Sequence, residues 1–476
     1  MLVKITVSND VIVRDLPTDI KKKIVEELTL PNPKFSEASK RGYSTYRIPE
    51  FLYNFKIMPD SSLKVPRGMK NKLESYLNDY GVPYDIESSL TFNDQPYNII
   101  GPNTTDFRPY QRKYLYEILA SGRTEGIIIS PAGSGKTIMA LAIMAALGQS
   151  TLWLTHRDPL IKQARNRFLK FSPYLRPEDV GLLQGKKWVP SPIITIGSVD
   201  SLRSRPKELK KLSKVFGLVI LDEAHHHPAK TFNKVISSLC PYFLYGLTAT
   251  PYRTDGLEKI MFQCIGDTIV NIPLQEVIDD GGIIMPTVFY RIVDHTKMEG
   301  NNNNQILKYL SSNEKRNYMI TGDVVSEAIM GKRSIVISTR KEHCEELYKI
   351  IKIGWEKTGI VTGDYPEKHN DGQLQKLLTG EITVIVASLE KFGEGVDVDI
   401  LDNAFLALPI RSEQDVEQLV GRIQRVEKNK KEAKLFDYLD INIGVSMDQF
   451  STPTKNKECR LKAYQRLGLI VKPVEG

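Results

Sequence analysis

The stretch IIISPAGSGKT, Ile127–Thr137, decides the fold: a short apolar run passes through a glycine-rich turn into a stretch with helical pattern. In that setting the turn is typical of a phosphate-binding loop. Its glycines let backbone N–H groups point at phosphate oxygens, Lys136 adds positive charge, and the Thr137 hydroxyl can hold Mg²⁺. Ser130 replaces the first glycine of the full pattern, but the later glycines preserve the turn. We predict a nucleoside-triphosphate site formed by Gly133, Ser134, Gly135, Lys136 and Thr137.

A second apolar run, FGLVILDEAHH at Phe216–His226, ends in two adjacent acids. At the end of a buried strand Asp222 can reach a bound Mg²⁺, while Glu223 can orient or deprotonate the water that attacks the γ-phosphate. The alternative is that the two acids only cap a helix, and that the glycine-rich turn upstream occurs by chance. The combination favours ATP hydrolysis, with Lys136, Asp222 and Glu223 as catalytic residues and Thr137 and Asp222 as metal ligands.

Short apolar runs alternate with helical stretches from Asp106 onward. Runs that are apolar throughout suit parallel strands buried on both faces. One series is GIIIS, TLWLT, PIITI, GLVILD and FLYGLT; the second, after an asparagine-rich loop, is SIVIS, GIVTG, TVIVAS, AFLALP and KLFDYLD. We predict an α/β protein with two successive parallel-sheet lobes, 99–285 and 286–476.

The first 98 residues are predicted to form a small α+β domain. The predicted strands are 2–7, 11–13, 51–57 and 63–65, and the predicted helices are 18–28 and 68–77. Asn, Asp, Pro and Ser between the members of each strand pair indicate hairpin turns. Residues 93–105, rich in Asn, Pro and Gly, are expected to be a linker.

Composition excludes several classes of protein. The 476 residues carry a net charge of +8, and 41% are hydrophobic, which suits a globular protein and only weakly favours a polyanionic partner. The four cysteines are too scattered for a zinc site or a disulfide framework. No apolar run reaches the roughly 18 to 20 residues needed to span a bilayer. We expect a soluble cytoplasmic protein, in the host cytoplasm if a phage encodes it.

QLVGRIQR, Gln418–Arg425, places two arginines three residues apart, on one face if the stretch is helical. Arg422 and Arg425 lie far along the chain from the phosphate-binding loop. They fit the role of cations that act on the triphosphate from the second lobe. A surface salt-bridge pair is the alternative.

Taken in order, these motifs resemble those of superfamily 2 helicases over most of residues 106 to 440. The matching stretches are FRPYQ at 107–111, SPAGSGKT at 130–137, LTHRDPLIKQ at 154–163, TIGSVDSL at 195–202, DEAH at 222–225, LTATP at 247–251, VISTRKEHCEEL at 336–347, ASLEKFGEGVDVD at 387–399 and QLVGRIQR at 418–425. The resemblance implies RecA-like lobes and an ATP-driven helicase that uses ATP and Mg²⁺.

The same resemblance implies roles for single residues. Nucleotide contacts are implied for Gln111, at the adenine, and for Gly395 and Asp397. Contacts to the γ-phosphate are implied for Gln418, Arg422 and Arg425. Coupling between nucleotide and nucleic acid is implied for His225, Thr248 and Thr250. Contacts to sugar and phosphate, which do not depend on base sequence, are implied for Arg157, Ser198 and Arg340.

The segment Asn32–Met69 is similar to the leader of phage UvsW-like helicases and, more distantly, of XPB-like proteins. That likeness implies DNA as the partner, in branched or forked form, with branch migration and fork regression as the activity and the first 98 residues as a duplex- or junction-binding domain. A structural lid is the alternative for that domain. Alternatives for the whole chain are an RNA helicase, the motor subunit of a restriction-type complex, and a nucleotide switch that does not unwind.

Overall fold

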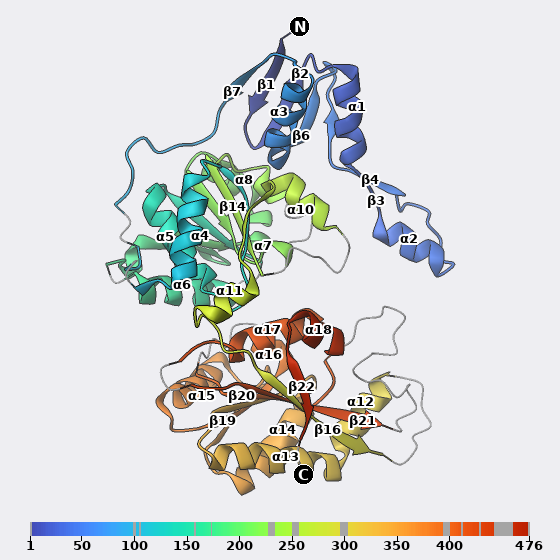
Figure 1. The fold of residues 1–476 in the computed structure, drawn as a ribbon, viewed down its shortest axis with the longest axis vertical. Helices are drawn as coiled ribbons and strands as arrows, with labels where there is room; N and C mark the ends of the chain where they lie inside the picture. Colours follow the sequence, from blue (N-terminus) through green and yellow to red (C-terminus); the bar gives the residue numbers. More distant parts are fainter. Residues whose placement is uncertain are drawn as a thin grey trace. The chain divides into compact units, whose positions relative to one another are not determined.

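In the computed structural model, the residues described are 2–98, 101–103, 106–156, 159–172, 174–226, 234–249, 257–295, 303–393, 400–410, 413–427, 430–441 and 460–474. The chain divides into two compact units, residues 1–131 with 135–274, and 132–134 with 275–476. Figure 1 shows the elements of each unit. In the described part of the chain, no helix is long and apolar enough to cross a membrane.

An N-terminal module, residues 2–98, begins the first unit. Its main sheet has the order β5-β6-β2-β1-β7, in which β1 pairs parallel with β7 and the other pairs are antiparallel. The strands are β1 (Val3–Val7), β2 (Asp10–Arg14), β5 (Lys56–Ile57), β6 (Leu63–Pro66) and β7 (Tyr84–Ser88). Helices α1 (Thr18–Glu27) and α3 (Lys70–Asp79) add their apolar faces to the core of this sheet, and a short helix η1 (Arg67–Met69) precedes α3.

The strand predicted at 51–57 is wrong as a single element. Phe51–Tyr53 (β4) pairs with Thr29–Pro31 (β3) in a separate two-stranded sheet, whereas β5 pairs with β6. The backbone N–H of Asn54, between β4 and β5, donates to the Leu28 carbonyl at 2.9 Å. Helix α2 (Pro33–Lys40) lies in the connection between β3 and β4.

Lobe 1 is built on an eight-stranded sheet of order β11-β10-β12-β9-β13-β14-β8-β15, parallel except for the pair β10 and β11. The strands are β8 (Glu125–Ile129), β9 (Thr151–Thr155), β10 (Val180–Gln184), β11 (Lys187–Val189), β12 (Ile194–Ser198), β13 (Leu218–Leu221), β14 (Phe243–Thr248) and β15 (Thr268–Asn271). The helices are α4 (Pro109–Ala120), α5 (Lys136–Leu147), α6 (Pro159–Phe171), α7 (Val199–Arg203), α8 (Pro206–Leu212), α10 (Glu258–Ile265) and α11 (Leu274–Asp279), with short turns η3 (Pro177–Asp179) and η4 (Ala224–His226).

Lobe 2 is built on a seven-stranded, all-parallel sheet of order β18-β19-β17-β20-β21-β16-β22. The strands are β16 (Thr287–Asp294), β17 (Ser334–Ser338), β18 (Thr358–Val361), β19 (Val384–Ser388), β20 (Asn403–Leu406), β21 (Lys434–Ile441) and β22 (Ile470–Pro473). The helices are α12 (Asn303–Ser312), α13 (Glu314–Ile329), α14 (Lys341–Gly354), α15 (Glu367–Thr379), α16 (Leu389–Gly393), α17 (Glu413–Ile423) and α18 (Arg460–Arg466). The predicted pair of parallel α/β lobes is therefore confirmed.

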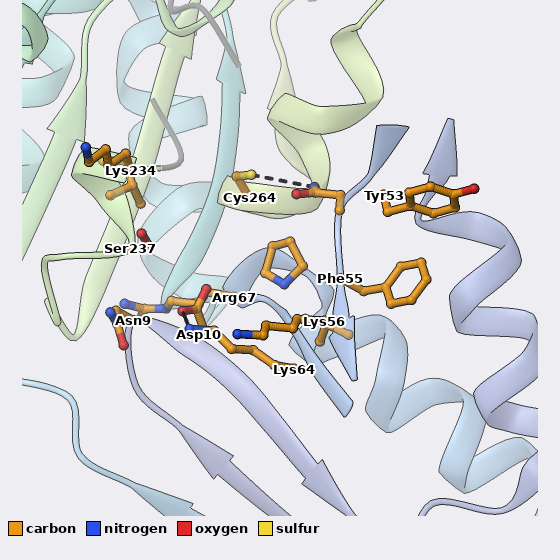
Figure 2. Close-up of a pocket in the computed structure, with 14 residues that line it drawn as sticks. Asn9, Asp10, Tyr53, Phe55, Lys56, Lys64, Arg67, Lys234, Ser237 and Cys264 are labelled. Carbon is orange, nitrogen blue, oxygen red and sulfur yellow. Dashed lines mark hydrogen bonds and ion pairs between the residues drawn. The ribbon is translucent and has the colours of Figure 1, made fainter. Parts of the chain in front are cut away.

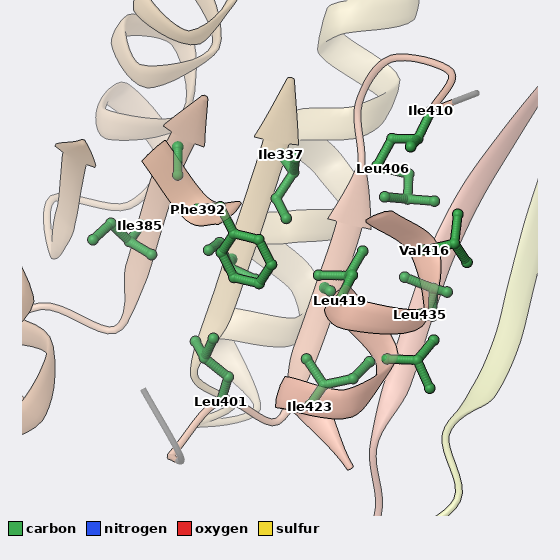
Figure 3. Close-up of a cluster of buried hydrophobic side chains, with 14 of the residues drawn as sticks. Ile337, Ile385, Phe392, Leu401, Leu406, Ile410, Val416, Leu419, Ile423 and Leu435 are labelled. Carbon is green, nitrogen blue, oxygen red and sulfur yellow. The ribbon is translucent and has the colours of Figure 1, made fainter. Parts of the chain in front are cut away.

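Helices on both faces explain why the strands of lobe 2 are apolar throughout. Ile335 and Ile337 of β17 belong to the core beneath α16, α17 and α18, while Val336 faces the core formed with α13 and α14. Figure 3 shows the first of these cores, with Phe392 from α16 and Leu419 from α17 directed at the strands. Alternating residues of one strand thus enter two different cores.

A buried ion pair joins the N-terminal module to lobe 1. The Arg67 guanidinium donates to Glu125 Oε2 at 2.7 Å and also to the carbonyls of Pro241 and Tyr242. Its side chain is 2% exposed and that of Glu125 1%. Leu30, from the β3–β4 ribbon, lies in the lobe 1 core. Removal of the module would therefore disturb lobe 1 itself.

The predicted linker is held against lobe 1 in its described part. The backbone N–H of Asn93 donates to Gln149 Oε1 at 2.8 Å, the N–H of Ser150 donates to Asn93 Oδ1 at 3.1 Å, and the Tyr97 N–H donates to the Gly148 carbonyl at 2.7 Å. Residues 93–97 are therefore hydrogen-bonded to lobe 1.

Candidate active site

Three neighbouring parallel strands bring the chemical motifs of lobe 1 together. Strands β13, β14 and β8 are adjacent in that order, so their carboxyl ends lie at one edge of the sheet. The phosphate-binding loop follows β8, the two acids follow β13, and Thr248 ends β14. The N–H of Ser130 donates to the Thr248 carbonyl at 2.9 Å. This edge is where α/β sheets bind ligands.

The phosphate-binding loop has the backbone conformation that its glycines predict. Gly133 and Gly135 have φ angles of 77° and 85°, in the left-handed region where residues with a Cβ are strained. Helix α5 begins at Lys136, so its unpaired N–H groups face the loop. A Cβ on Gly135 would lie 2.6 Å from Gln111 Nε2. Gln111, predicted to read adenine, is therefore adjacent to the loop; it is buried and its Oε1 accepts from the Arg108 N–H at 3.0 Å.

The predicted catalytic charges are within reach of one another. Lys136 Nζ lies 3.3 Å from Glu223 Oε1 and 3.4 Å from the Ser130 carbonyl. Glu223 has a φ of 46°, unusual for a residue with a side chain and typical of a functional turn. Desolvation, with the neighbouring Glu223 charge, raises the pKa of Asp222 from 3.8 to about 7. Part of Asp222 is accessible, but its carboxyl group is surrounded by protein.

His225 links the acids to the neighbouring strand. Its Nδ1 lies 2.7 Å from Thr248 Oγ1 and 3.6 Å from Glu223 Oε2. The hydroxyl and imidazole are both buried. If bound nucleotide displaced Glu223, the His225 side chain would connect that movement to β14. Thr250, the other predicted coupling residue, lies outside the described residues.

Sequence reasoning missed one cation near this site. Arg167 Nη1, from α6, donates to Thr137 Oγ1 at 3.4 Å, and its charge lowers the pKa of Asp222 against the larger effect of burial. The contact joins two helices that follow different strands, so no local motif reports it.

The oxygen atoms near the loop suit Mg²⁺. A Thr137 hydroxyl and one Asp222 carboxylate are hard donors, and Mg²⁺ in phosphate sites takes one or two carboxylates with water and phosphate oxygens. A carboxyl group with a raised pKa is also one that a cation would stabilise in its charged form. The residues present fit the ion.

The two arginines predicted to share a helix face do not share one. Helix α17 ends at Ile423, and Arg425 forms a backbone bridge with Ile283, because the chain leaves the helix to pair with that segment. Arg422 is 8% exposed; its guanidinium lies 4.2 Å from the Phe392 ring centre and donates to the Phe392 carbonyl. Gln418, one helical turn before Arg422, is half-buried.

The residues predicted to contact the nucleic-acid backbone lie in different environments. Ser198 is fully buried at the end of β12, and its Oγ accepts from the Ser201 N–H at 3.2 Å as the cap of α7. Arg340 precedes α14 and its Nη2 donates to the Asn304 carbonyl at 3.2 Å. Arg157, Gly395 and Asp397 lie outside the described residues.

Comparison with known proteins agrees with this geometry. The family described as type III restriction enzyme, res subunit, matches residues 104–253, and the helicase conserved C-terminal domain matches residues 320–427. The chain is 26% identical to the probable helicase D10 of Escherichia phage T5, over 83% of this chain and 85% of that protein. It is 23% identical to the ATP-dependent DNA helicase uvsW of Enterobacteria phage T4, over 76% and 73% of the two.

A solved structure supports the fold alone. A fragment of a putative HsdR subunit of a type I restriction enzyme from Vibrio vulnificus matches 97% of this chain and 84% of that one, with 17% identity and a TM-score of 0.55. The two parallel-sheet lobes, the loop and acids at one sheet edge, and the two family matches have one explanation. The chain belongs to the superfamily 2 helicases and is an ATP-driven nucleic-acid helicase.

Proposed function

We propose that this helicase is a DNA translocase that remodels branched DNA, by fork regression and branch migration, in recombination and replication. The observation that carries the proposal is the similarity, over most of both chains, to a phage protein named as an ATP-dependent DNA helicase. The resemblance of Asn32–Met69 to the leader of branch-migrating helicases adds to it. A cytoplasmic location, in a host cell if phage-encoded, goes with this role.

For the ATP reaction, the proposed residues are those at the sheet edge of lobe 1. Lys136 binds the β and γ phosphates, the backbone of 133–137 cradles them, and Gln111 contacts the base. Glu223 accepts the proton of the attacking water. Thr137 and Asp222 would hold Mg²⁺, which neutralises phosphate charge when bound. The ion pair of Lys136 with Glu223 supports placing the phosphate-binding cation and the proton acceptor side by side.

The other proposed roles concern coupling and the nucleic-acid track. The proposed coupling of nucleotide binding to nucleic-acid binding runs through His225, Thr248 and Thr250. The first two of these are hydrogen-bonded to each other. The lobe 2 residues proposed to contact the nucleotide are Gly395, Asp397, Gln418, Arg422 and Arg425. Contacts to the nucleic-acid backbone are proposed for Arg157 and Arg340, and Ser198, which is buried, would support such contacts as the cap of α7. Residues 1–98, 99–285 and 286–476 are the proposed domains, the first of them binding duplex or junction.

An RNA helicase is the second candidate, because the chain is also 25% identical, over 74% of its length, to a putative ATP-dependent RNA helicase of Acanthamoeba polyphaga mimivirus. A restriction-type motor is a third, favoured by the family that matches residues 104–253.

One panel of substrates separates these functions. ATPase rate and strand-exchange products would be measured with single-stranded DNA, blunt duplex, fork, four-way junction and RNA. The proposal expects the largest stimulation and product yield with fork and junction. Stimulation by RNA above every DNA would reverse the order of the first two candidates.

A further inference from the structure

An exposed arm, residues 32–54, projects from the N-terminal module as α2 and the loop that returns to β4, as Figure 1 shows. Most of its side chains are exposed to solvent; Asn32 and Ala38 are the buried ones. The arm therefore contributes little to a core, and a core does not explain its aromatic content.

The arm nevertheless has a defined conformation. Asn32 closes its base: Nδ2 donates to the Pro49 carbonyl at 2.7 Å, and Oδ1 accepts from the Lys34 N–H at 3.2 Å to cap α2. The N–H of Tyr43 donates to the Ala38 carbonyl at 2.9 Å and ends the helix. Aromatic side chains beyond that point are thus presented from a fixed backbone.

Three tyrosines of the arm are exposed: Tyr43 by 66%, Tyr46 by 81% and Tyr53 by 64%. Cations are interspersed among them, since the arm holds four Lys or Arg and two Glu, a net charge of +2. The Arg47 guanidinium lies 5.6 Å from the Tyr46 ring centre. Exposed aromatic faces beside guanidinium groups are suited to stacking with bases.

A basic cleft continues from the arm. It has a volume of about 360 Å³, lies between the N-terminal module and lobe 1, and is lined by Tyr53, Lys56 and Lys234 among others. Figure 2 shows Tyr53 and Lys56 on the module and Lys234 on lobe 1.

The charge available in the cleft comes from two lysines. Arg67 is paired with Glu125, and Lys64 with Asp10 at 2.5 Å. Among the described residues, no ion pair engages Lys56 or Lys234, and both are exposed. The cleft therefore suits a polyanion that passes along its lining.

We propose that the arm and the cleft bind an unpaired nucleic-acid strand, with bases stacked on Tyr43 and Tyr46 and phosphates held by Lys56 and Lys234. A duplex does not fit this chemistry as well, because its bases are stacked on one another and offer no free face. A branch point supplies such a strand. The inference rests on the proposed function and names the part of the substrate that this surface takes.

The test uses the full chain and equilibrium binding of a fluorescent oligo(dT) and of a blunt duplex. Tyr43→Leu/Tyr46→Leu keeps apolar area but removes both rings, and Tyr43→Phe/Tyr46→Phe keeps the rings. Tyr318→Leu, an equally exposed tyrosine of α13 in lobe 2 at 61%, is the matched control. Unfolding midpoints should be the same for all of them, because the replaced side chains are exposed.

The double Leu variant should bind oligo(dT) at least about tenfold more weakly. The Phe variant and the Tyr318 control should bind like wild type, and blunt-duplex affinity should not change. Lys56→Gln/Lys234→Gln should lower the slope of log affinity against log salt by about 1.4, the value for two phosphate contacts on a single strand.

Other outcomes overturn the inference in distinguishable ways. Equal losses on oligo(dT) and duplex would mean that the arm holds a duplex backbone. Unchanged binding by the Leu variant, while wild type binds both ligands, would remove the arm from the nucleic-acid surface and leave the helicase assignment intact. Failure of wild type to bind any nucleic acid would instead reject the proposed function.

Discussion

Lys136 is held by a carboxylate where a phosphate is expected to bind. Its ammonium lies 3.3 Å from Glu223 Oε1. We expect ATP to replace that carboxylate with the γ-phosphate, which frees Glu223 to accept a proton from water. His225, 3.6 Å from Glu223 and 2.7 Å from Thr248, would sense the change.

Glu223→Gln should therefore bind ATP at least as tightly as wild type and hydrolyse it at least about 100-fold more slowly, because the amide no longer competes for Lys136 and cannot accept a proton. Nucleotide binding by equilibrium titration and turnover under saturating ATP would measure the two effects. Glu178→Gln, on the surface of the same lobe, is the control. Normal hydrolysis by the Glu223→Gln variant would remove Glu223 as the base.

The raised pKa of Asp222 makes stability depend on pH. Because the folded carboxyl titrates near 7 and the unfolded one near 3.8, the native state binds the proton more tightly, and the free energy of unfolding falls as pH rises between these values. Asp222→Asn removes that fall. Without nucleotide or Mg²⁺, its advantage over wild type should grow by about 2 to 3 kcal/mol from pH 5 to pH 8 in denaturant titrations. A constant difference would contradict the burial of this charge.

The two arginines of QLVGRIQR should respond differently. Arg422→Ala loses a buried hydrogen bond and a cation–π contact, so lobe 2 should lose about 1 to 3 kcal/mol of stability. Arg425→Ala should keep stability and ATP affinity but lower hydrolysis, because a cation acting on transition-state charge affects turnover more than binding. Chemical denaturation and steady-state kinetics separate the two. Equal loss of ATP binding and turnover in Arg425→Ala would indicate a ground-state contact.

At the scale of elements, the sequence predicted what local pattern determines. Apolar runs such as TLWLT form parallel strands, as predicted. The phosphate-binding loop and the two acids lie at strand ends, also as predicted, because each of these features depends on a few adjacent residues. The division of 51–57 was missed, since a second partner strand at Thr29–Pro31 decides it. The end of α17 before Arg425 and the Arg167 contact with Thr137 were missed for the same reason: their partners are distant in sequence.

The contact between the N-terminal module and lobe 1 gives a prediction for an element boundary. Arg67→Met leaves the Glu125 carboxylate buried without its cation and should cost about 3 to 5 kcal/mol, whereas Arg67→Met/Glu125→Leu should recover most of the loss. Thermal and denaturant unfolding of the two variants would show the difference. Equal stability of both variants would mean that the pair does not hold the module to lobe 1.

For the whole molecule, this contact changes how the module's role should be tested. A chain that begins near Asn103 would keep every motor motif, but it would lack Arg67, Leu30 and the Asn93 contacts to Gln149 and Ser150. Lobe 1 would lose partners of its own core. Surface variants of the intact chain therefore separate junction handling from motor stability better than truncation does.

ATP turnover at the lobe 1 sheet edge is proposed to power the remodelling of branched DNA. The most direct measurement follows a labelled four-way junction with ATP, for wild type and for Lys136→Ala, beside an RNA duplex of matched length. Wild type should convert the junction to duplex products and leave most of the RNA paired, and Lys136→Ala, without the main side-chain partner of the phosphates, should convert neither. Junction processing by Lys136→Ala at the wild-type rate would contradict the role of this ATP site. Unwinding of RNA by the wild type, with the junction left intact, would contradict the proposed action on branched DNA.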